Sequence, residues 1–474
     1  MTTVAEKQRV AVIGGGLAGL SAAVNLARHG LAVTLFERSP HMGGRAQTTL
    51  KDGYHINFGP HAFYLGGPGH SFLQDLGIET AGSAPPIANA VGFYKGRTPI
   101  LPLSLGAIFK TDLFSLADKL RLIKLMLRLN SINENDFESL TVNAWIDLDK
   151  DLCRAGDALK SFVRALIQLS TYTRDTDKMS ARAGLYQLKS AVRNGVRYLH
   201  GGWAQLVDAL VDKARELEVT LVAGCEVIEV SRNSQNGDFN VAFKDKTKGL
   251  LRESFSGLVL AAPPEVVKMI TSAKAMKSGQ IPLNLGGDEL VDVKAACLDI
   301  CLSELPRPEM TYSLGLDEPL YYSVHSSAAQ LTPPNGALIH AAYYLKHGET
   351  GTPQIEKRLE EMVDTLQPGW REKLVYKRFL ANITVVHKIL SIKEGKLGGY
   401  WTEETDEPGV YRAGDWVGVE QLADSSLASA KRSSELLVAH LESAPKSSPN
   451  SNSKERAYWS EWQGARAQVH ESTQ

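Results

Sequence analysis

A glycine-rich turn near the start of the chain constrains its fold more than any other feature of the sequence. The apolar, β-branched run 9–14 leads into a GxGxxG pattern that begins at Gly14, and a helical apolar pattern follows over 17–29. A second apolar run, 32–36, ends at the acidic residue Glu37. Strand, glycine turn, helix and strand within about 30 residues predict one βαβ unit, and with it an α/β fold.

The positions of Gly14, Gly16 and Gly19 match the spacing of a turn that holds a dinucleotide. The first glycine permits a tight turn, the second lets backbone amides approach a pyrophosphate, and the third lets the helix pack close to the strand. The amides of Leu17 and Ala18 would then face the diphosphate at the positive end of the helix dipole. The carboxylate that closes the second strand would accept hydrogen bonds from ribose hydroxyls. The alternative is a chance glycine turn beside a surface carboxylate.

Two further glycine motifs suit the same chemistry. Gly43 and Gly44 permit close backbone approach, and the adjacent Arg45 supplies a fixed charge for a phosphate. Gly414 and Asp415 lie at the end of the last predicted strand, before a last predicted helix. The alternative for the first is a surface turn with a solvated arginine, and for the second an ordinary strand-to-helix turn with Asp424 or Ser425 as the helix cap.

Composition excludes several classes of protein. The chain has 474 residues with 52 basic and 53 acidic side chains, a formal net charge of −1, and 43% hydrophobic residues. Apolar surface is ample for a folded core, and the basic excess that a nucleic-acid binder needs is missing. The four cysteines show no CxxC pair or zinc-binding spacing, so we expect no metal site and a cytoplasmic protein with reduced thiols. The sequence has no apolar run of about 18 residues, so we expect no transmembrane helix.

The order of the predicted elements indicates two interleaved domains. Dinucleotide-type segments occupy 1–70, 200–290 and 395–442. Helical and strand-like patterns fill 71–199 and 291–394, with strand-like runs near 296–302, 320–325, 337–345 and 374–380. We therefore predict a Rossmann-like domain interleaved with a substrate domain of antiparallel sheet plus helices. The polar stretch 443–474 is typical of a flexible tail.

Together these motifs resemble the FAD-dependent flavin-containing amine oxidase and phytoene desaturase superfamily, over about 10–441. The stretch from Gly201 to Val227 resembles that family's second FAD-facing segment, and the run 258–263 resembles its "I-x-A-x-P" strand. The resemblance implies non-covalent FAD, since 1–152 and 302–474 hold no cysteine. The residues that it places on FAD are Gly14, Gly16, Leu17, Ala18, Gly19, Glu37, Arg38, Gly43, Gly44, Arg45, Gly59, Pro60, His61, Glu226, Val227, Gly414, Asp415 and Leu422.

Details of the motifs favour the desaturase-like branch and a protoporphyrinogen oxidase-like fold. Gly59-Pro60 resembles desaturases and protoporphyrinogen oxidases, although Asn57 stands where the family commonly has an acidic residue. The stretch 420–424 has no aromatic residue, whereas amine oxidases place one there to cage the amine. The resemblance thus implies hydride transfer between flavin N5 and an apolar substrate, such as an isoprenoid, a carotenoid or another lipid, in desaturation, oxidation or isomerisation. The alternatives are an amine or amino-acid oxidase that produces hydrogen peroxide, and a non-catalytic binding protein related to the Rab GDP-dissociation inhibitors.

Candidate residues for the chemistry lie close to the flavin-facing motif. His61 is the first candidate for a catalytic polar group, with Tyr64 and His55 behind it, although His61 could instead cap its loop or bind FAD. Candidates for the substrate cavity are Tyr172, His340, Tyr343 and Trp401.

A leucine-rich helix predicted over 113–130 carries Lys119, Arg121, Lys124 and Arg128. This pattern makes the helix a candidate for peripheral membrane contact, through which a lipophilic substrate could enter. The alternative is a substrate-domain helix that buries one side.

Overall fold

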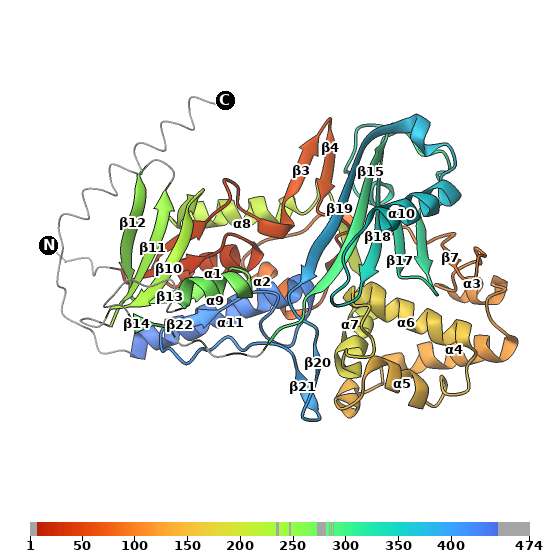
Figure 1. The fold of residues 1–474 in the computed structure, drawn as a ribbon, viewed down its shortest axis with the longest axis horizontal. Helices are drawn as coiled ribbons and strands as arrows, with labels where there is room; N and C mark the ends of the chain where they lie inside the picture. The colour runs from red at the N-terminus through yellow and green to blue at the C-terminus, as the bar shows by residue number, and fades with distance from the viewer. Residues whose placement is uncertain are drawn as a thin grey trace.

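The computed structural model describes residues 7–233, 237–245, 248–272, 281–283, 285, 287 and 289–443. The predicted tail 443–474 lies outside the described residues except for Ser443, which ends the last helix. Figure 1 shows two lobes, one with the N-terminal strands and the last helix, the other with a long-stranded sheet above a group of helices. The α/β class predicted from the sequence is confirmed, while the limits of the two domains stay a prediction.

The first lobe is built on a parallel sheet with strand order β22-β13-β1-β2-β9. Its strands are β1 (Arg9–Ile13), β2 (Ala32–Glu37), β9 (Thr220–Ala223), β13 (Gly257–Leu260) and β22 (Val410–Arg412). The strands are almost continuously apolar because both faces of the sheet are covered. The strand–turn–helix–strand unit expected at the N-terminus forms here, with α1 (Leu17–Arg28) between β1 and β2.

Successive side chains of these strands alternate between two cores. Val10 and Val12 pack with α1, α8 (Ala204–Glu216) and α11 (Leu422–Ser443). Ala11 and Ile13 pack on the other face against a four-stranded antiparallel sheet and α9 (Pro264–Thr271). That sheet has the order β12-β11-β10-β14, from β10 (Glu226–Arg232), β11 (Phe239–Asp245), β12 (Gly249–Phe255) and β14 (Ile281–Pro282).

The second lobe contains a six-stranded sheet with the order β19-β15-β18-β17-β16-β7. Its strands are β7 (Val91–Phe93), β15 (Val293–Leu302), β16 (Tyr312–Gly315), β17 (Leu320–Val324), β18 (Ala337–Leu345) and β19 (Leu374–Val386). Neighbours are antiparallel except β16 and β7. The four strand-like runs of the sequence thus lie in one sheet, and β16 and β7 complete it.

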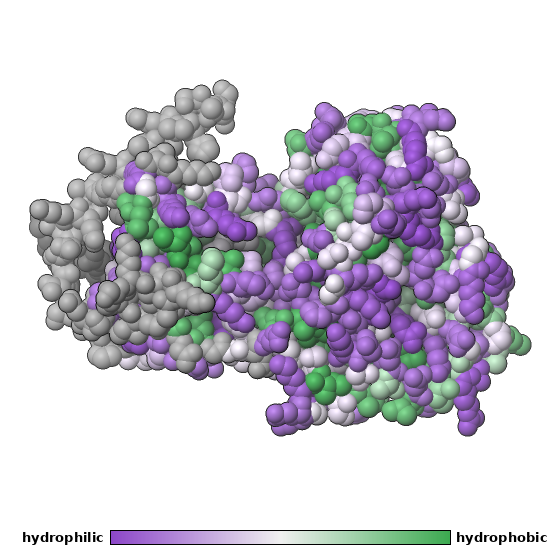
Figure 2. All heavy atoms as spheres, in the orientation of Figure 1, coloured by the Kyte–Doolittle hydropathy of each residue, from purple (hydrophilic) through white to green (hydrophobic). Residues whose placement is uncertain are grey.

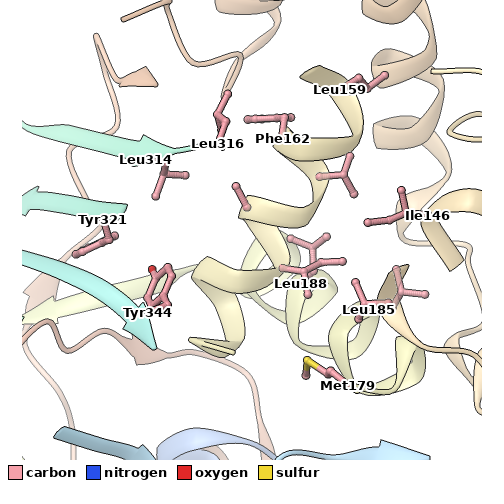
Figure 3. Packing of buried hydrophobic residues seen from close by; sticks show 14 of the residues in the cluster. Ile146, Leu159, Phe162, Met179, Leu185, Leu188, Leu314, Leu316, Tyr321 and Tyr344 are labelled. Carbon is pink, nitrogen blue, oxygen red and sulfur yellow. The ribbon is translucent and has the colours of Figure 1, made fainter. Parts of the chain in front are cut away.

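Helices cover both faces of this sheet. One face packs on α10 (Pro353–Leu366). The other packs on α4 (Leu116–Leu129), α5 (Val142–Leu148), α6 (Asp157–Thr171) and α7 (Ala181–Asn194). Figure 3 shows this contact, with apolar side chains of α5, α6 and α7 beside Leu314, Tyr321 and Tyr344 of the sheet. The predicted helix 113–130 begins only at Leu116, because the Ser115 hydroxyl accepts a hydrogen bond from the Asp118 amide and caps it.

Shorter elements complete the two lobes. They are the hairpin β3 (Thr48–Lys51) with β4 (Tyr54–Asn57), the small sheet of β5 (Phe63–Tyr64), β8 (Val196–Leu199) and β6 (Gly82–Ser83), the helices α2 (Pro68–Asp75) and α3 (Leu105–Lys110), and the hairpin β20 (Ser391–Lys393) with β21 (Lys396–Gly398). In the described parts of the chain, none of the helices is both long and apolar enough to cross a bilayer. Within the same ranges, no group of three or more His, Cys, Asp or Glu residues is arranged to hold a metal ion.

Candidate cofactor and substrate site

A cavity of about 580 Å³ lies at the carboxyl ends of the parallel strands and reaches the six-stranded sheet. Its walls include the turn after β1, the end of β2 and the turn after β22. On the opposite side they include Ala295 and Cys297 of β15 and residues 382–385 of β19. Ligands of open α/β sheets bind at this edge, where strand ends and helix starts meet. The cavity therefore joins the two lobes.

The first glycine turn can hold its shape only with glycine. Gly14 has a φ of +111°, and a Cβ there would lie 2.7 Å from the Ala261 carbonyl oxygen. A Cβ on Gly19 would lie 1.8 Å from the Gly14 carbonyl oxygen, so Gly19 allows α1 to pack against the turn and lies behind the cavity wall. Gly16, Leu17 and Ala18 line the cavity at the N-terminal end of α1, where the first backbone amides have no partner within the helix.

The carboxylate of Glu37 is held at the end of β2 by two backbone amides. One oxygen accepts from the Gly15 amide at 2.7 Å, and the other accepts from the Ser39 amide at 2.7 Å. Glu37 lines the cavity beside Arg38, Glu226 and Val227. Carboxylate oxygens have further lone pairs, so this group can still accept hydrogen bonds from ligand hydroxyls.

An ion pair between the partly exposed Arg45 and the buried Asp415 connects the two other glycine motifs. The Arg45 guanidinium lies 2.8 Å from an oxygen of Asp415 and also donates to the carbonyls of Thr384 and Val385. His387 donates to the same carboxylate from its backbone amide at 3.1 Å and from Nδ1 at 3.0 Å. Burial alone would raise the pKa of Asp415, but Arg45 and His387 hold that pKa well below its usual range. Asp415 is therefore ionised at the cavity wall.

His387 and Lys388 carry contacts that no sequence motif indicated. The Lys388 Nζ donates to the carbonyls of Val417 and Gly418, at 3.0 and 2.7 Å, and to the Ser425 hydroxyl at 2.8 Å. Burial lowers the pKa of Lys388 to about 7. These two residues follow the end of β19 and fix the turn after β22 to the start of α11. Their partners lie 28 to 37 positions away, so no local pattern reveals them.

The end of the cavity next to the six-stranded sheet is formed by uncharged side chains. Those at this end are Phe58, Pro60, His61, Ala62, Tyr172, Ala295, Cys297, Asn382 and Ile383. His61 Nδ1 lies 3.1 Å from the Gly59 carbonyl, and the imidazole ring meets Trp203 edge to face. Burial lowers the pKa of His61 to about 4, so this imidazole is neutral at physiological pH. The Tyr172 hydroxyl donates to the Pro60 carbonyl at 3.2 Å.

Most of the residues expected to bind the cofactor lie on this one cavity. The exceptions are Gly19 and Gly59, which allow close backbone packing behind the wall. The lining members of the predicted set are Gly14, Gly16, Leu17, Ala18, Glu37, Arg38, Gly43, Gly44, Arg45, Pro60, His61, Glu226, Val227, Gly414, Asp415 and Leu422. Their roles toward a bound group stay predictions.

Two catalytic candidates lie away from the cavity lining. Tyr64 is turned toward α6, where its hydroxyl donates to the Ser170 carbonyl at 2.9 Å. His55 sits in the β3–β4 hairpin, paired with Leu50, so the hairpin rather than the cavity surrounds it. Only His61 of the three candidates faces the cavity.

Of the four substrate-cavity candidates, Tyr172 alone lines the cavity. Tyr343 lies on the face of β18 that packs with α10, because side chains alternate along the strand. His340 shares the inner face but lies behind the wall, with Nδ1 2.6 Å from Asp299. Trp401 packs edge to face on Trp416 in the first lobe, with ring centroids 5.0 Å apart.

Comparison with known proteins identifies the family. The family model for flavin containing amine oxidoreductase matches residues 17–282, which is more than half of the chain. The chain belongs to the flavin-containing amine oxidoreductase family. Members of this family are oxidoreductase enzymes, so the protein is an oxidoreductase and its cofactor is FAD.

Two curated relatives are similar to part of this chain. Coproporphyrinogen III oxidase of Bacillus subtilis (strain 168) is 34% identical over 132 residues, which cover 24% of this chain and 28% of that protein. Carotenoid phi-ring synthase of Streptomyces griseus is 38% identical over 129 residues, covering 24% of this chain and 25% of that protein. The match therefore spans only about a quarter of each relative.

A solved structure shows the same fold over most of the chain. Cyclohexylamine oxidase from Brevibacterium oxydans IH-35A superposes with a TM-score of 0.62 at 14% identity, covering 92% of this chain and 100% of that one. At this identity the likeness concerns the fold alone.

Proposed function

We propose that this enzyme transfers hydride between N5 of FAD and an apolar substrate of isoprenoid, carotenoid or related lipid type. The observation that carries the proposal is the charge distribution of the cavity. Among the described lining residues, the Asp, Glu, Lys and Arg side chains all lie near the glycine motifs: Glu37, Arg38, Arg45, Glu226 and Asp415. The opposite end is uncharged, as an apolar substrate requires.

The same distribution weighs against charged substrates. An ammonium group would need a nearby carboxylate, and the substrate-side end of the cavity provides none among its described residues. A porphyrinogen carboxylate would need a free cation. Arg378, which lies beside Phe58, and Arg45, on the cavity wall, are already paired with Asp299 and Asp415. The partial match to carotenoid phi-ring synthase supports an apolar substrate.

The residues around the cavity fit FAD. We assign the first turn with Glu37 to the adenosine diphosphate, and Gly43, Arg45 and Asp415 to the pyrophosphate and ribityl region. When bound, FAD supplies the two-electron acceptor that this reaction needs. Burial raises the pKa of the Cys297 thiol well above its usual value, so this thiol is a poor nucleophile, which supports non-covalent binding of FAD.

His61 is the group we assign to proton handling. Its Nδ1–H donates to the Gly59 carbonyl, which leaves the lone pair of Nε2 free for the cavity. A neutral imidazole can accept the proton that leaves a carbon next to the one that loses hydride. Phe58, Ala295 and Ile383 give this end apolar walls, which suit an apolar substrate.

Anaerobic bleaching of the flavin absorption near 450 nm, with a panel of polyenes, other isoprenoids and amines, tests the function. Bleaching by apolar compounds and not by amines is the expected result. Bleaching by amines alone, with hydrogen peroxide released in air, would instead make the protein an amine oxidase. The non-catalytic alternative is set aside, because the chain belongs to a family of oxidoreductases.

We also propose that the enzyme lies at a cytoplasmic membrane surface, because one surface of the second lobe carries exposed apolar side chains. We call this surface, formed by α3 and α4, the leucine face. Its exposed apolar residues are Leu105, Phe109, Leu116, Leu120 and Leu127, each more than half exposed. Figure 2 shows hydrophobic residues along the edge of the molecule where α4 lies. The exposed Lys110 and Lys124 beside them suit an anionic lipid surface.

A further inference from the structure

A buried carboxylate sits in the middle of the six-stranded sheet. Asp299 on β15 is fully buried and lies opposite His340 on β18 and Arg378 on β19. One carboxylate oxygen lies 2.6 Å from His340 Nδ1. The other accepts from Nε and a terminal nitrogen of Arg378, at 2.9 and 2.6 Å. Three adjacent strands therefore meet in one charged cluster on the sheet face toward the cavity.

Arg378 also reaches the loop that carries His61. The same terminal nitrogen that contacts Asp299 donates to the Asn57 carbonyl at 2.5 Å, and the guanidinium lies 5.3 Å from the centre of the Phe58 ring. Phe58, Pro60 and His61 follow in the chain and line the cavity. The guanidinium thus bridges the sheet and the start of this loop.

The rest of the loop is pressed against the same strands. Gly59 has a φ of +75°, and a Cβ there would lie 2.9 Å from the Cys297 sulfur and 2.8 Å from Ile383. His61 is then set by its contact with the Gly59 carbonyl and by the Trp203 ring. The position of His61 in the cavity therefore depends on how the loop rests on β15 and β19.

Folding alone does not explain this ion pair. Burying an aspartate and an arginine costs desolvation energy, and apolar replacements of such pairs are often neutral or stabilising. A guanidinium can, however, contact a carboxylate and a carbonyl at once in fixed directions, which an apolar side chain cannot do. The pair fixes a distance between the sheet and the loop.

We propose that Asp299 and Arg378 form a positioning pair that places His61 in the cavity. This inference rests on the proposed role of His61. Neither Asp299 nor Arg378 lines the cavity, so they act through the loop rather than on the substrate.

A double-mutant cycle with Arg378→Lys and His61→Gln tests the positioning. Arg378→Lys keeps the charge but cannot bind Asp299 and the Asn57 carbonyl at the same time in fixed directions. We therefore expect the rate of anaerobic flavin bleaching to fall about 10- to 100-fold, with KM little changed. In the His61→Gln background the same substitution should change the rate less than twofold, because the group that it positions is gone. Equal effects in both backgrounds would overturn the proposal.

Arg358→Lys is the matched control. Arg358 makes a similar forked contact with Glu318, at 2.7 and 3.0 Å, on α10 and far from the cavity. The Arg358→Lys substitution should leave the bleaching rate unchanged. A loss of rate equal to that of Arg378→Lys would contradict a specific role of Arg378. If Arg378→Lys does not fold, Asp299→Asn takes its place in the cycle, since it keeps the side-chain shape and removes the charge.

Visible circular dichroism of bound FAD separates this inference from the proposed function. Arg378→Lys should change the dichroic band near 450 nm, and in the His61→Gln background it should add no further change. This readout needs no substrate, so it still tests the positioning when no tested compound bleaches the flavin. An unchanged band would overturn the positioning whatever the substrate proves to be.

Discussion

At the scale of the residue, the cavity combines a charged end and a neutral end, and His61 is the histidine of the neutral end. Because burial lowers the pKa of His61 to about 4, the imidazole is unprotonated throughout the physiological range. The rate of flavin bleaching should therefore be flat from about pH 5 to 8 and fall on the acid side near pH 4. His61→Gln should lower the plateau about 100-fold and remove the acid limb. An acid limb near pH 6.5 would contradict the assignment of His61.

Asp415 makes a second prediction at this scale. Its ionised form is stabilised by Arg45 and His387, and its folded pKa lies below that of an unfolded aspartate, about 3.9. This stabilisation is fully present above about pH 4 and is lost as the pH falls through the lower, folded pKa. Asp415→Asn should lower the free energy of unfolding at pH 7 by about 3 kcal/mol, the low end for a broken buried pair since Arg45 is partly exposed. It should also weaken FAD binding, measured by titration of the apoprotein. A melting curve unchanged at pH 7 would contradict the pair.

Site residues can be predicted from the sequence when the pattern that identifies them lies within a few neighbouring positions. Gly14, Glu37 and Gly43 could be found because glycine spacing next to a strand end is itself the signature of close backbone approach. His387 and Arg378 could not, because they act on partners 28 and 79 positions away in the chain. Alternation along β18 puts His340 and Tyr343 on opposite faces, but the sequence does not show which face is turned toward the cavity; Tyr343 lies on the α10 side.

At the scale of the element, the end of β19 matters more than its sequence suggests. The strand carries Arg378 in the sheet, lines the cavity at 382–385, and leads into His387 and Lys388, which hold the turn after β22. The residue pattern of 374–380 predicts a strand, but it does not predict that the strand extends to Val386 or that it contacts both lobes. The packing of α10 on the six-stranded sheet, by contrast, follows from the spacing of its buried apolar residues Leu359, Met362, Val363 and Leu366.

Lys388 predicts how this connection responds to pH. Its pKa is lowered to about 7, so between pH 7 and about 10.4 the unfolded chain binds more protons at this site than the folded one. The stability that Lys388 contributes should rise with pH in this window, by at most about 1.4 kcal/mol per pH unit. The melting-temperature gap between the wild type and Lys388→Met should therefore be wider at pH 9.5 than at pH 7. A gap that narrows with rising pH would show that the amine is charged in the folded protein.

At the scale of the whole molecule, the cavity lies where the two lobes meet, and the leucine face lies on α3 and α4 of the second lobe. The sequence predicted the helix with its basic residues but could not decide between a buried and an exposed apolar side. The structure shows both, because Leu122, Leu125 and Leu129 are buried while Leu116, Leu120 and Leu127 remain exposed. Spacings of four and seven residues place the exposed leucines on one side of α4.

If the leucine face rests on a lipid surface, the enzyme should bind anionic vesicles. Each leucine that inserts contributes about 1.5–3 kcal/mol at full burial, and each nearby lysine about 1 kcal/mol toward anionic lipid. Replacing Leu116, Leu120 and Leu127 together by Asn should lower partitioning into phosphatidylglycerol-containing vesicles at least tenfold, measured by cosedimentation. The melting temperature should hold, since these side chains are exposed. Leu374→Asn with Val375→Asn, at exposed positions of β19, is the control that should bind as the wild type does. Equal partitioning of the triple variant, or no binding by the wild type, would exclude lipid as the occupant of this face, and a lipophilic substrate would then have to reach the cavity from solution or from a carrier.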